Sequence, residues 1–237
     1  MADLAVIVPS RGRPNQLVAM ATAAWDFAER AIPHRLRIVV GVDEDDPDRS
    51  EYLLHGHPFL DVRVGPRRSL SGWTNHLAEQ LLAERNPPRY LASLGDDHRP
   101  RTPGWDRRLI AAIESLGGAP GIAYGNDLLQ GGRLPTAWVV SAELVRAVGW
   151  MMLPTCEHLF VDNAVLALGQ ASGRILYCPD VVIEHVHPVA GKAAWDDSYR
   201  ATNAPERYAT DREAFTRWQR EGGLAADVAK ILAAPHG

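Results

Sequence analysis

Short apolar runs alternate with amphipathic stretches along the first hundred residues, and this alternation limits the possible folds more than any other feature. The apolar runs, which we interpret as strands, are residues 4–8, 36–42, 62–64 and 90–94. Apolar residues at helical spacing follow Pro14, and they recur from Trp73 to Leu81 after a capping residue that we expect to be Ser71. Strands that are apolar throughout and separated by helices are typical of a mostly parallel sheet covered on both faces. The sequence therefore predicts an α/β fold.

Polar loops follow three of these strands, at residues 10–13, 43–48 and 95–99. Parallel sheets bind ligands beyond the carboxyl ends of their strands. The same loops contain most of the residues in this region that can carry chemistry. We therefore expect a functional site at this edge of the sheet.

The composition is that of a compact globular protein. Of 237 residues, 46% are apolar and 23% charged, and the net charge is -4, which argues against binding nucleic acid through bulk positive charge. No apolar stretch approaches the ~20 residues of a membrane span, so no membrane partner is expected, and the first residues do not resemble a signal peptide. We expect a cytoplasmic protein.

The second half of the chain shows a different pattern. Strands are expected at residues 122–124, 138–140, 175–177 and 181–187, with a helix over 158–171. The segment 195–237 reads as a polar, mostly helical extension. We therefore predict a single-domain core over 1–194 followed by this C-terminal tail.

Two clusters contain candidate metal ligands. Asp96 and Asp97 directly follow the fourth strand, and Mg²⁺ or Mn²⁺ favours carboxylate oxygens. His185 and His187 alternate along a predicted strand and share a face. A solvated acidic turn and a pair of structural histidines are the alternatives.

Four motifs in order resemble glycosyltransferases of the GT-A fold, specifically the inverting family 2. They are the opening VIVPSRGRP, the acidic loop after the second strand, the LGDDHRPRTPGW segment and the FVDN helix. The resemblance spans about residues 4–190. The short core is similar to compact phage and metagenomic members, a group that includes DNA hydroxymethylpyrimidine glycosyltransferases. For a phage-encoded protein, the expected cytoplasm is that of the bacterial host. The resemblance implies that about residues 1–100 form a half that binds the nucleotide-sugar and that about residues 101–194 form a half that binds the acceptor.

The resemblance implies a Mn²⁺ or Mg²⁺ ion and a nucleotide-sugar donor, commonly a UDP-sugar. Asp97 matches the metal-binding acid of the family motif, and His185 or His187 matches a histidine that completes the cation site in some members. Gly95 stands where the family has its first acid, so Asp96 is the candidate to replace it. The remaining donor-binding candidates are Pro9, Ser10, Arg11, Arg13, Asp43, Arg67, Arg68, Trp73 and Asn75.

Asp162 matches the general base of inverting members. A positioned carboxylate can take the proton of an acceptor hydroxyl as the bond to the sugar forms, while a metal neutralises the departing diphosphate. Glu157 and His158 are alternative bases if the register differs by one turn. Single displacement by this arrangement inverts the sugar carbon.

The acceptor hypothesis is a 5-hydroxymethylpyrimidine in phage-type DNA. Residues 63–108 contain nine arginines and five acids, a local charge of +4 that can track a phosphate backbone. The candidates for contacting a base extruded from the duplex are Trp138, His158, Lys192, Trp195 and Tyr199. The alternative acceptor is a soluble glycan or protein, with Trp138, Trp150 and Trp195 as stacking platforms.

Two hypotheses from other classes remain open. A nucleotidyltransferase also holds Mg²⁺ with acids at a strand edge, but it releases pyrophosphate. A non-catalytic module that only recognises nucleotide or DNA is suggested by Gly95 in place of an acid.

Overall fold

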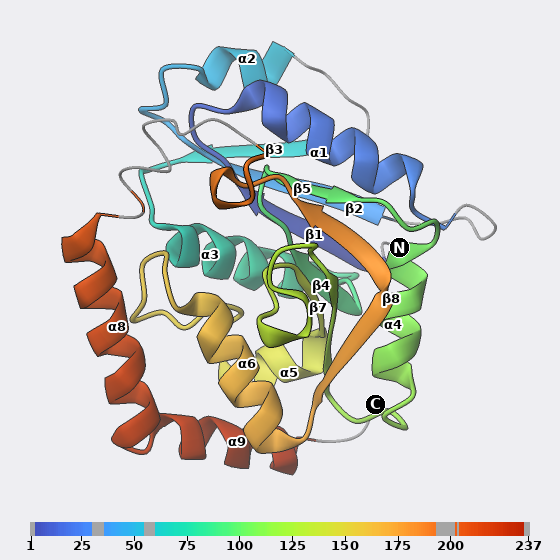
Figure 1. The fold of residues 1–237 in the computed structure, drawn as a ribbon, viewed down its shortest axis with the longest axis vertical. Coiled ribbons are helices and arrows are strands. Elements are labelled where there is room, and N and C mark those ends of the chain that lie inside the picture. The colour runs from blue at the N-terminus through green and yellow to red at the C-terminus, as the bar shows by residue number, and fades with distance from the viewer. Residues whose placement is uncertain (1–2, 30–35, 55–59, 193–201, 203, 235–237) are drawn as a thin grey trace.

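The protein, described here from a computed structural model that covers residues 3–29, 36–54, 60–192, 202 and 204–234, is built around one mixed sheet (Figure 1). Along the chain the strands are β1 (Leu4–Pro9), β2 (Leu36–Asp43), β3 (Leu60–Gly65), β4 (Tyr90–Ser93), β5 (His98–Pro100), β6 (Ile122–Asn126), β7 (Trp138–Ser141) and β8 (Ile175–His185). The α-helices are α1 (Pro14–Asp26), α2 (Arg49–Leu54), α3 (Leu70–Leu82), α4 (Trp105–Glu114), α5 (Ala142–Val148), α6 (Val161–Ser172), α8 (Pro205–Arg220) and α9 (Gly223–Ala233). Two 3₁₀ turns are η1 (Gly131–Arg133) and η2 (Pro188–Ala190).

The strand order is β3-β2-β1-β4-β7-β6-β8-β5. The β1, β2, β3 and β4 strands run parallel, while β7 runs antiparallel to both β4 and β6. The carboxyl ends of β1, β2 and β4 therefore meet at one edge, and the loops that follow them lie side by side. This confirms the predicted α/β fold with a mostly parallel sheet.

Two apolar cores lie on opposite faces of the sheet. On one face, alternate residues of β1 pack with α1 and α4, through side chains such as Leu17 and Ile110. On the other face, the intervening residues of β1 pack with α3, α5 and α6, through side chains such as Leu77 and Leu168. Successive residues of a strand point to opposite faces, so the unbroken apolar run of β1 supplies both cores.

The C-terminal helices join the second of these cores. Ile231 of α9 is 1% exposed and belongs to the same buried cluster as α3 and α6, and Phe215 and Trp218 of α8 pack against that cluster. Figure 1 shows α8 and α9 arranged around the outer side of α6. The described part of the predicted tail is thus helical, as expected, and packs on the core.

Several boundaries differ from the sequence-based expectations. The predicted strands at 175–177 and 181–187 form one strand, β8, because a register shift opposite Gly125 and Asn126 lets the chain continue past Pro179. The helix expected from His158 begins at Val161. The cap of α3 is Ser69, whose side chain accepts a bond from the backbone N–H of Gly72, whereas the Ser71 hydroxyl donates to a distant carbonyl.

Among the residues that the structure describes, every helix is too short or too polar to span a lipid bilayer.

Gly41 provides a test of the packing between β2 and α3. A methyl group added at Gly41 would lie 2.7 Å from the Trp73 ring. We expect Gly41→Ala to lower the free energy of unfolding by about 1–3 kcal/mol, because overpacking forces the ring or the strand to move. Denaturant unfolding measures the change. In a Trp73→Leu background the same substitution should cost clearly less, and an equal cost in both backgrounds would contradict the contact.

Candidate active site

A cleft of about 1380 Å³ lies at the carboxyl ends of the parallel strands. Most of the site residues predicted from sequence line it: Pro9, Ser10, Arg11, Arg13, Asp43, Arg67, Arg68, Trp73, Asp96, Asp97, Trp138, His158, Asp162, His185 and His187. The loop between β6 and β7, the loop between α5 and α6 and the start of α8 form the far wall. The cleft therefore brings together residues from nearly the whole length of the chain.

Asp43 joins the loops of the donor side. Its carboxylate is 4% exposed, and it accepts hydrogen bonds from the Trp73 indole at 2.6 Å, the Arg68 backbone N–H at 3.0 Å and the Arg11 guanidinium at 3.0 Å. Arg11 also donates to Asp45 at 2.6 Å, and this bond is the main cause of its raised pKa. Three of the four lone-pair positions of Asp43 are thus occupied, which leaves one for a ligand.

Asp96 is buried beneath the first loop. The Ser10 hydroxyl donates to it at 2.7 Å, and Arg13 lies 3.4 Å from its other oxygen. The Ser10 proton is used in this bond, so in the 3.0 Å contact between the two hydroxyls Tyr52 is the donor and Ser10 the acceptor. The Tyr52 oxygen in turn accepts a bond from the Arg13 backbone N–H at 2.8 Å. Burial and, to a smaller extent, the charge of Asp97 raise the pKa of Asp96 to about 6, against the opposing effects of Arg13 and Ser10. The acid that was expected to replace the missing first acid therefore has protein partners on both oxygens.

Asp97, His98 and His185 form a compact cluster. The Nε2 atom of His185 lies 3.2 Å from Asp97, and the rings of His98 and His185 stack with centroids 4.3 Å apart. The antiparallel pairing of β5 with β8 sets His98 opposite His185 and produces this contact. Strand pairing thus joins two motifs that are separated by about ninety residues in the sequence.

The pKa values of the two histidines in the cluster are shifted in opposite directions. The Nδ1 atom of His98 accepts a bond from the Gly95 backbone N–H at 2.8 Å, so its proton sits on Nε2, and burial lowers its pKa to about 3. Burial also opposes charge on His185, but the hydrogen bond and the charge of Asp97 outweigh it and raise the His185 pKa. The same cluster therefore contains one imidazole with a strongly lowered pKa and one with a raised pKa.

The donor set of this cluster fits a divalent cation. One ligand atom from each of Asp97, His98 and His185 lies within 4.8 Å of the others. Among the described residues, His185 Nδ1 is buried without a hydrogen-bond partner and is the imidazole nitrogen open to a cation. His98 Nε2 is also buried without a partner, but it bears the ring proton, so it could bind a cation only in the other tautomer. A carboxylate with imidazole nitrogens is a common ligand set for a divalent transition metal. His187 lies beside this cluster, with its ring centroid 4.9 Å from that of His185, and its Nδ1 accepts a bond from the Val189 backbone N–H.

Asp162 stands in the first turn of α6 and faces the same cleft. Burial raises its pKa to about 7; His185 lowers it, and Asp127 and Asp97 raise it. Burial likewise lowers the pKa of His158, to about 4. The pKa of Asp162 thus lies near neutral pH, in the range that suits a general base.

Asp127 supports the cluster from behind and was not identified from the sequence. Its Oδ1 atom accepts three backbone N–H bonds, from Leu129, Gln130 and Gly131, at 2.6–3.0 Å, and its Oδ2 accepts from Thr136 at 2.8 Å. These bonds outweigh burial and lower its pKa. Oδ2 also lies 4.0 Å from His185 Nδ1. Its position directly after the apolar strand 122–126 is a signal that could have identified it.

The predicted residues Asn75 and Lys192 are not among the residues that line the cleft. The side-chain amide of Asn75 donates to the Met152 carbonyl and accepts from the backbone N–H groups of Met151 and Met152, at 2.7–2.9 Å. Lys192 pairs with Glu184 at 2.8 Å. Trp150 also lies away from the cleft, where it donates to a buried acid of α9. Trp195 and Tyr199 lie outside the described residues.

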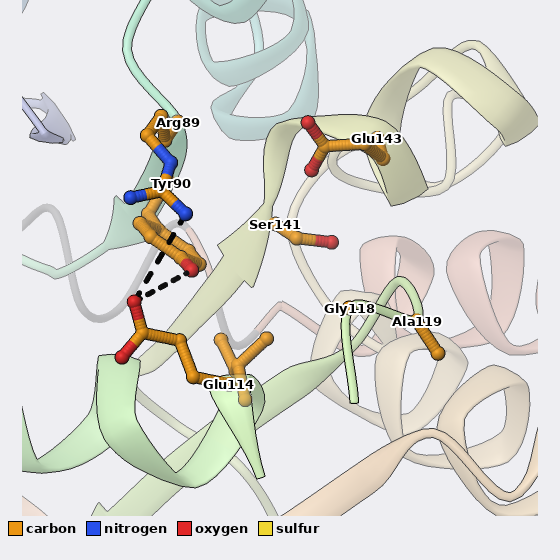
Figure 2. A pocket seen from close by; sticks show the side chains of 8 residues that line it. Arg89, Tyr90, Glu114, Gly118, Ala119, Ser141 and Glu143 are labelled. Carbon is orange, nitrogen blue, oxygen red and sulfur yellow. Dashed lines mark hydrogen bonds and ion pairs between the residues drawn. The ribbon is translucent and has the colours of Figure 1, made fainter. Parts of the chain in front are cut away.

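A second, much smaller pocket of about 180 Å³ lies at the opposite end of β4 (Figure 2). Glu114 accepts a bond from the Tyr90 hydroxyl at 3.4 Å and lies 4.0 Å from Arg89. The Arg89 guanidinium also lies over the Tyr90 ring. These contacts pair the polar groups of this pocket with one another, so we attribute the chemistry to the large cleft.

Gly95 explains the departure from the family motif and generates a prediction. A Cβ atom at this position would lie 2.5 Å from an Asp97 oxygen and 3.0 Å from His98 Nδ1. We expect Gly95→Asp, which restores the family's first acid, to weaken Mn²⁺ binding at least about tenfold, because the added side chain displaces two of the cluster residues. Calorimetric titration with Mn²⁺ measures this. Equal or tighter binding than in the wild type would contradict the geometry.

Comparison with known proteins gives relatives by structure only. No protein-family model matches the sequence, and no curated protein matches it. The mannosyltransferase PcManGT from Pyrobaculum calidifontis, solved with GDP-Man and Mn²⁺, aligns with a TM-score of 0.58 at 15% identity, covering 98% of this chain and 74% of that chain. TarS 1–349 from S. aureus aligns with a TM-score of 0.56 at 10% identity, covering 98% and 89%. Glucosyl-3-phosphoglycerate synthase from Mycobacterium tuberculosis, solved with Mn²⁺, UDP-glucose and phosphoglyceric acid, aligns with a TM-score of 0.59 at 11% identity, covering 91% and 80%. The chain therefore has the GT-A-like fold of these glycosyltransferases.

Proposed function

We propose that the protein is a metal-dependent glycosyltransferase that moves a sugar from a nucleotide-sugar to an acceptor hydroxyl. The observation that carries this proposal is the placement of the Asp97, His98 and His185 cluster and of Asp162 on one cleft. Cation ligands and a carboxyl group of near-neutral pKa are the two chemical requirements of the reaction. The shared fold with sugar-transferring enzymes supports the same assignment.

The donor site is proposed at the loops after β1 and β2. Arg11 and Arg68 line this side of the cleft, and Arg68 lies over the Trp73 ring at 5.6 Å, which holds its guanidinium in place. Arginine binds phosphate oxygens through paired N–H donors. The remaining lone pair of Asp43 is available for a base N–H. A UDP-sugar fits the sequence resemblance, and related structures contain GDP-Man, UDP or UDP-GlcNAc.

Asp97 and His185 are the proposed residues that would hold Mn²⁺ or Mg²⁺. His185 is preferred to His187 because it lies 3.2 Å from Asp97, whereas the Nδ1 of His187 is bonded to its own turn. A divalent cation there supplies positive charge against the diphosphate that leaves. His98 remains uncharged at neutral pH, so it adds no repulsion to this site.

Asp162 is the proposed general base. As the acceptor oxygen bonds to the sugar carbon, the bond from that carbon to the diphosphate oxygen breaks, and Asp162 takes the acceptor proton. A single displacement of this kind inverts the sugar carbon, as the resemblance to family 2 implies. Asp162 is half-buried and lines the cleft, so a bound acceptor would displace water from its carboxyl group.

The size of the cleft and the residues that line it limit how an acceptor can bind. The cleft is larger than the 300–1,000 Å³ of typical small-molecule pockets, so it has room for a donor and an acceptor together. Trp138 lines the cleft but is 1% exposed, which leaves little ring surface for stacking on a sugar or a base. His158, near the start of α6, is the predicted acceptor contact with the better position, because it lies on the same segment as Asp162.

The basic segment gives limited support to a hydroxymethylpyrimidine in DNA as acceptor. Five of its arginines lie within 4.0 Å of a carboxylate: Arg63, Arg67, Arg89, Arg101 and Arg107. Arg99 donates to backbone carbonyls of its own loop. The local excess of positive charge is therefore largely compensated within the protein, and a soluble glycan or protein acceptor is an equal alternative.

Asp162→Asn separates chemistry from binding. We expect the variant to lose at least about a hundredfold in transfer rate, because Asn cannot take the acceptor proton, while its affinity for nucleoside diphosphate with Mn²⁺ stays within about twofold. Single-turnover transfer and calorimetry measure the two quantities. As the matched variant, Asp97→Ala should lose Mn²⁺ binding as well as transfer. A fully active Asp162→Asn protein would contradict the assignment of the base.

A donor and acceptor panel tests the function itself. Nucleotide-sugars are incubated with Mn²⁺ and with hydroxymethylated DNA, unmodified DNA or soluble glycans, and the released product is identified, with EDTA as the control. We expect metal-dependent release of a nucleoside diphosphate. Release that needs the hydroxymethyl group would establish the DNA acceptor. Pyrophosphate from nucleoside triphosphates would indicate a nucleotidyltransferase instead, and no release from any donor would favour a binding module.

A further inference from the structure

Asp211, in the middle of α8, forms an unusual contact with a distant segment of the chain. Its side chain is 1% exposed, and its two oxygens accept hydrogen bonds from the backbone N–H groups of Glu157, His158 and Leu159, at 2.8, 3.0 and 2.8 Å. A buried carboxylate is costly unless it is fully hydrogen-bonded. The three N–H groups compensate this cost only when residues 157–159 adopt this one conformation.

The same helix holds the segment by two further contacts. Arg207, one turn before Asp211, donates to the Glu157 carboxylate. Phe160 packs against Tyr208 at 5.1 Å and Phe215 at 5.7 Å, both from α8. Phe160 has a φ of +62°, a left-handed conformation that is uncommon for a residue with a large side chain. The aromatic contacts therefore stabilise a backbone turn that would otherwise be unfavourable.

The segment is also fastened on its other side, to α3. The Ser71 hydroxyl donates to the Cys156 carbonyl, and the Ser71 backbone N–H donates to the Glu157 carbonyl at 3.1 Å. Asn75 holds Met151 and Met152 in the same way. Residues 151–160 thus bridge the helix that begins at the donor side of the cleft and the C-terminal helix.

This segment leads directly into α6 and into the proposed base. Phe160 is the residue before the first turn of α6, and Asp162 lies in that turn. A shift of the segment would move Asp162 and His158 relative to the metal cluster. Displacements of about 1 Å at a reacting group can reduce a rate by about a hundredfold.

We propose that Asp211 is a positioning residue of the active site, which sets Asp162 and the acceptor wall against the donor loops through the backbone of residues 157–159. This inference rests on the proposed function, and it makes α8 a part of the catalytic apparatus. Asp211 itself touches no reacting atom in this scheme. Its effect passes through the three N–H groups.

Asp211→Asn tests the proposal, with Asp227→Asn as the matched control. Asp227 is likewise a buried acid of the C-terminal helices, but it accepts from the side chains of Trp150, Trp218 and Lys230 and not from the segment 157–159. The Asn amide group places N–H donors where N–H groups already point, so at least one of the three bonds is lost. Both variants should therefore unfold at a lower temperature.

Only Asp211→Asn should change catalysis and local exchange. We expect kcat to fall at least about tenfold, with the donor KM and the affinity for nucleoside diphosphate and Mn²⁺ within about twofold, and amide hydrogen exchange at residues 157–159 to accelerate at least about tenfold. Asp227→Asn should keep kcat within about twofold and the exchange of these amides unchanged.

Two results in the kinetic measurements would overturn the positioning role, and one in the exchange measurement would do the same. One is unchanged kcat in Asp211→Asn, and the other is an equal loss of kcat in both variants, which would mean a general loss of stability. A wild-type protein without turnover in the donor panel contradicts the proposed function, and the catalytic part of this inference falls with it. Unchanged exchange at residues 157–159 in Asp211→Asn contradicts the inference alone, so the two failures are distinguishable.

Discussion

Buried carboxylates bonded to N–H and O–H donors hold the loops around the cleft in place. Asp43 joins the loops after β1, β2 and β3, Asp96 joins the first loop to α2 through Ser10 and Tyr52, and Asp127 folds the turn after β6. A carboxylate taken out of water is costly unless its lone pairs are satisfied. Each of these acids therefore permits few backbone arrangements around it. The order of the cleft follows from this requirement, since the loops themselves contain little regular structure.

The sequence was sufficient to predict several of the residues at the strand ends that line the cleft, although Asp127, directly after β6, was missed. Asp97 and the pair His185 and His187 were predicted as candidate metal ligands from separate motifs, and the antiparallel pairing of β5 with β8 brings Asp97 and His185 together. What local pattern could not reveal were contacts between segments far apart. Tyr52 lies on a six-residue helix with no periodic signal, and Asp211 lies 52 to 54 residues from its partners. Asn75 has the residue type of a ligand contact, but its amide is bonded to the backbone at Met151 and Met152.

The substitution of Gly95 for an acid shows how fold and site constrain one another. The resemblance to family 2 makes Gly95 look like a loss of function, because the family has an acid there. In the structure, the space that a side chain would need at Gly95 is filled by Asp97 and His98. The His98 ring that fills this space also stacks on His185. In this chain, a glycine two residues before Asp97 therefore goes together with a histidine directly after it that belongs to the cluster.

The packing of Ile231 has a consequence for how the chain reaches its native state during synthesis. Ile231 belongs to the same buried cluster as residues of β1 and α3. A ribosome makes the strands of the donor loops first, yet the apolar face they share with α6 cannot be fully covered until α9 has left the exit tunnel. Until then this face is exposed in an incomplete intermediate, the kind of state in which chains aggregate or engage chaperones. The sheet edge that we propose to bind the donor is thus synthesised first, and the wall that bears Asp162 is fully packed only after α9 has been made.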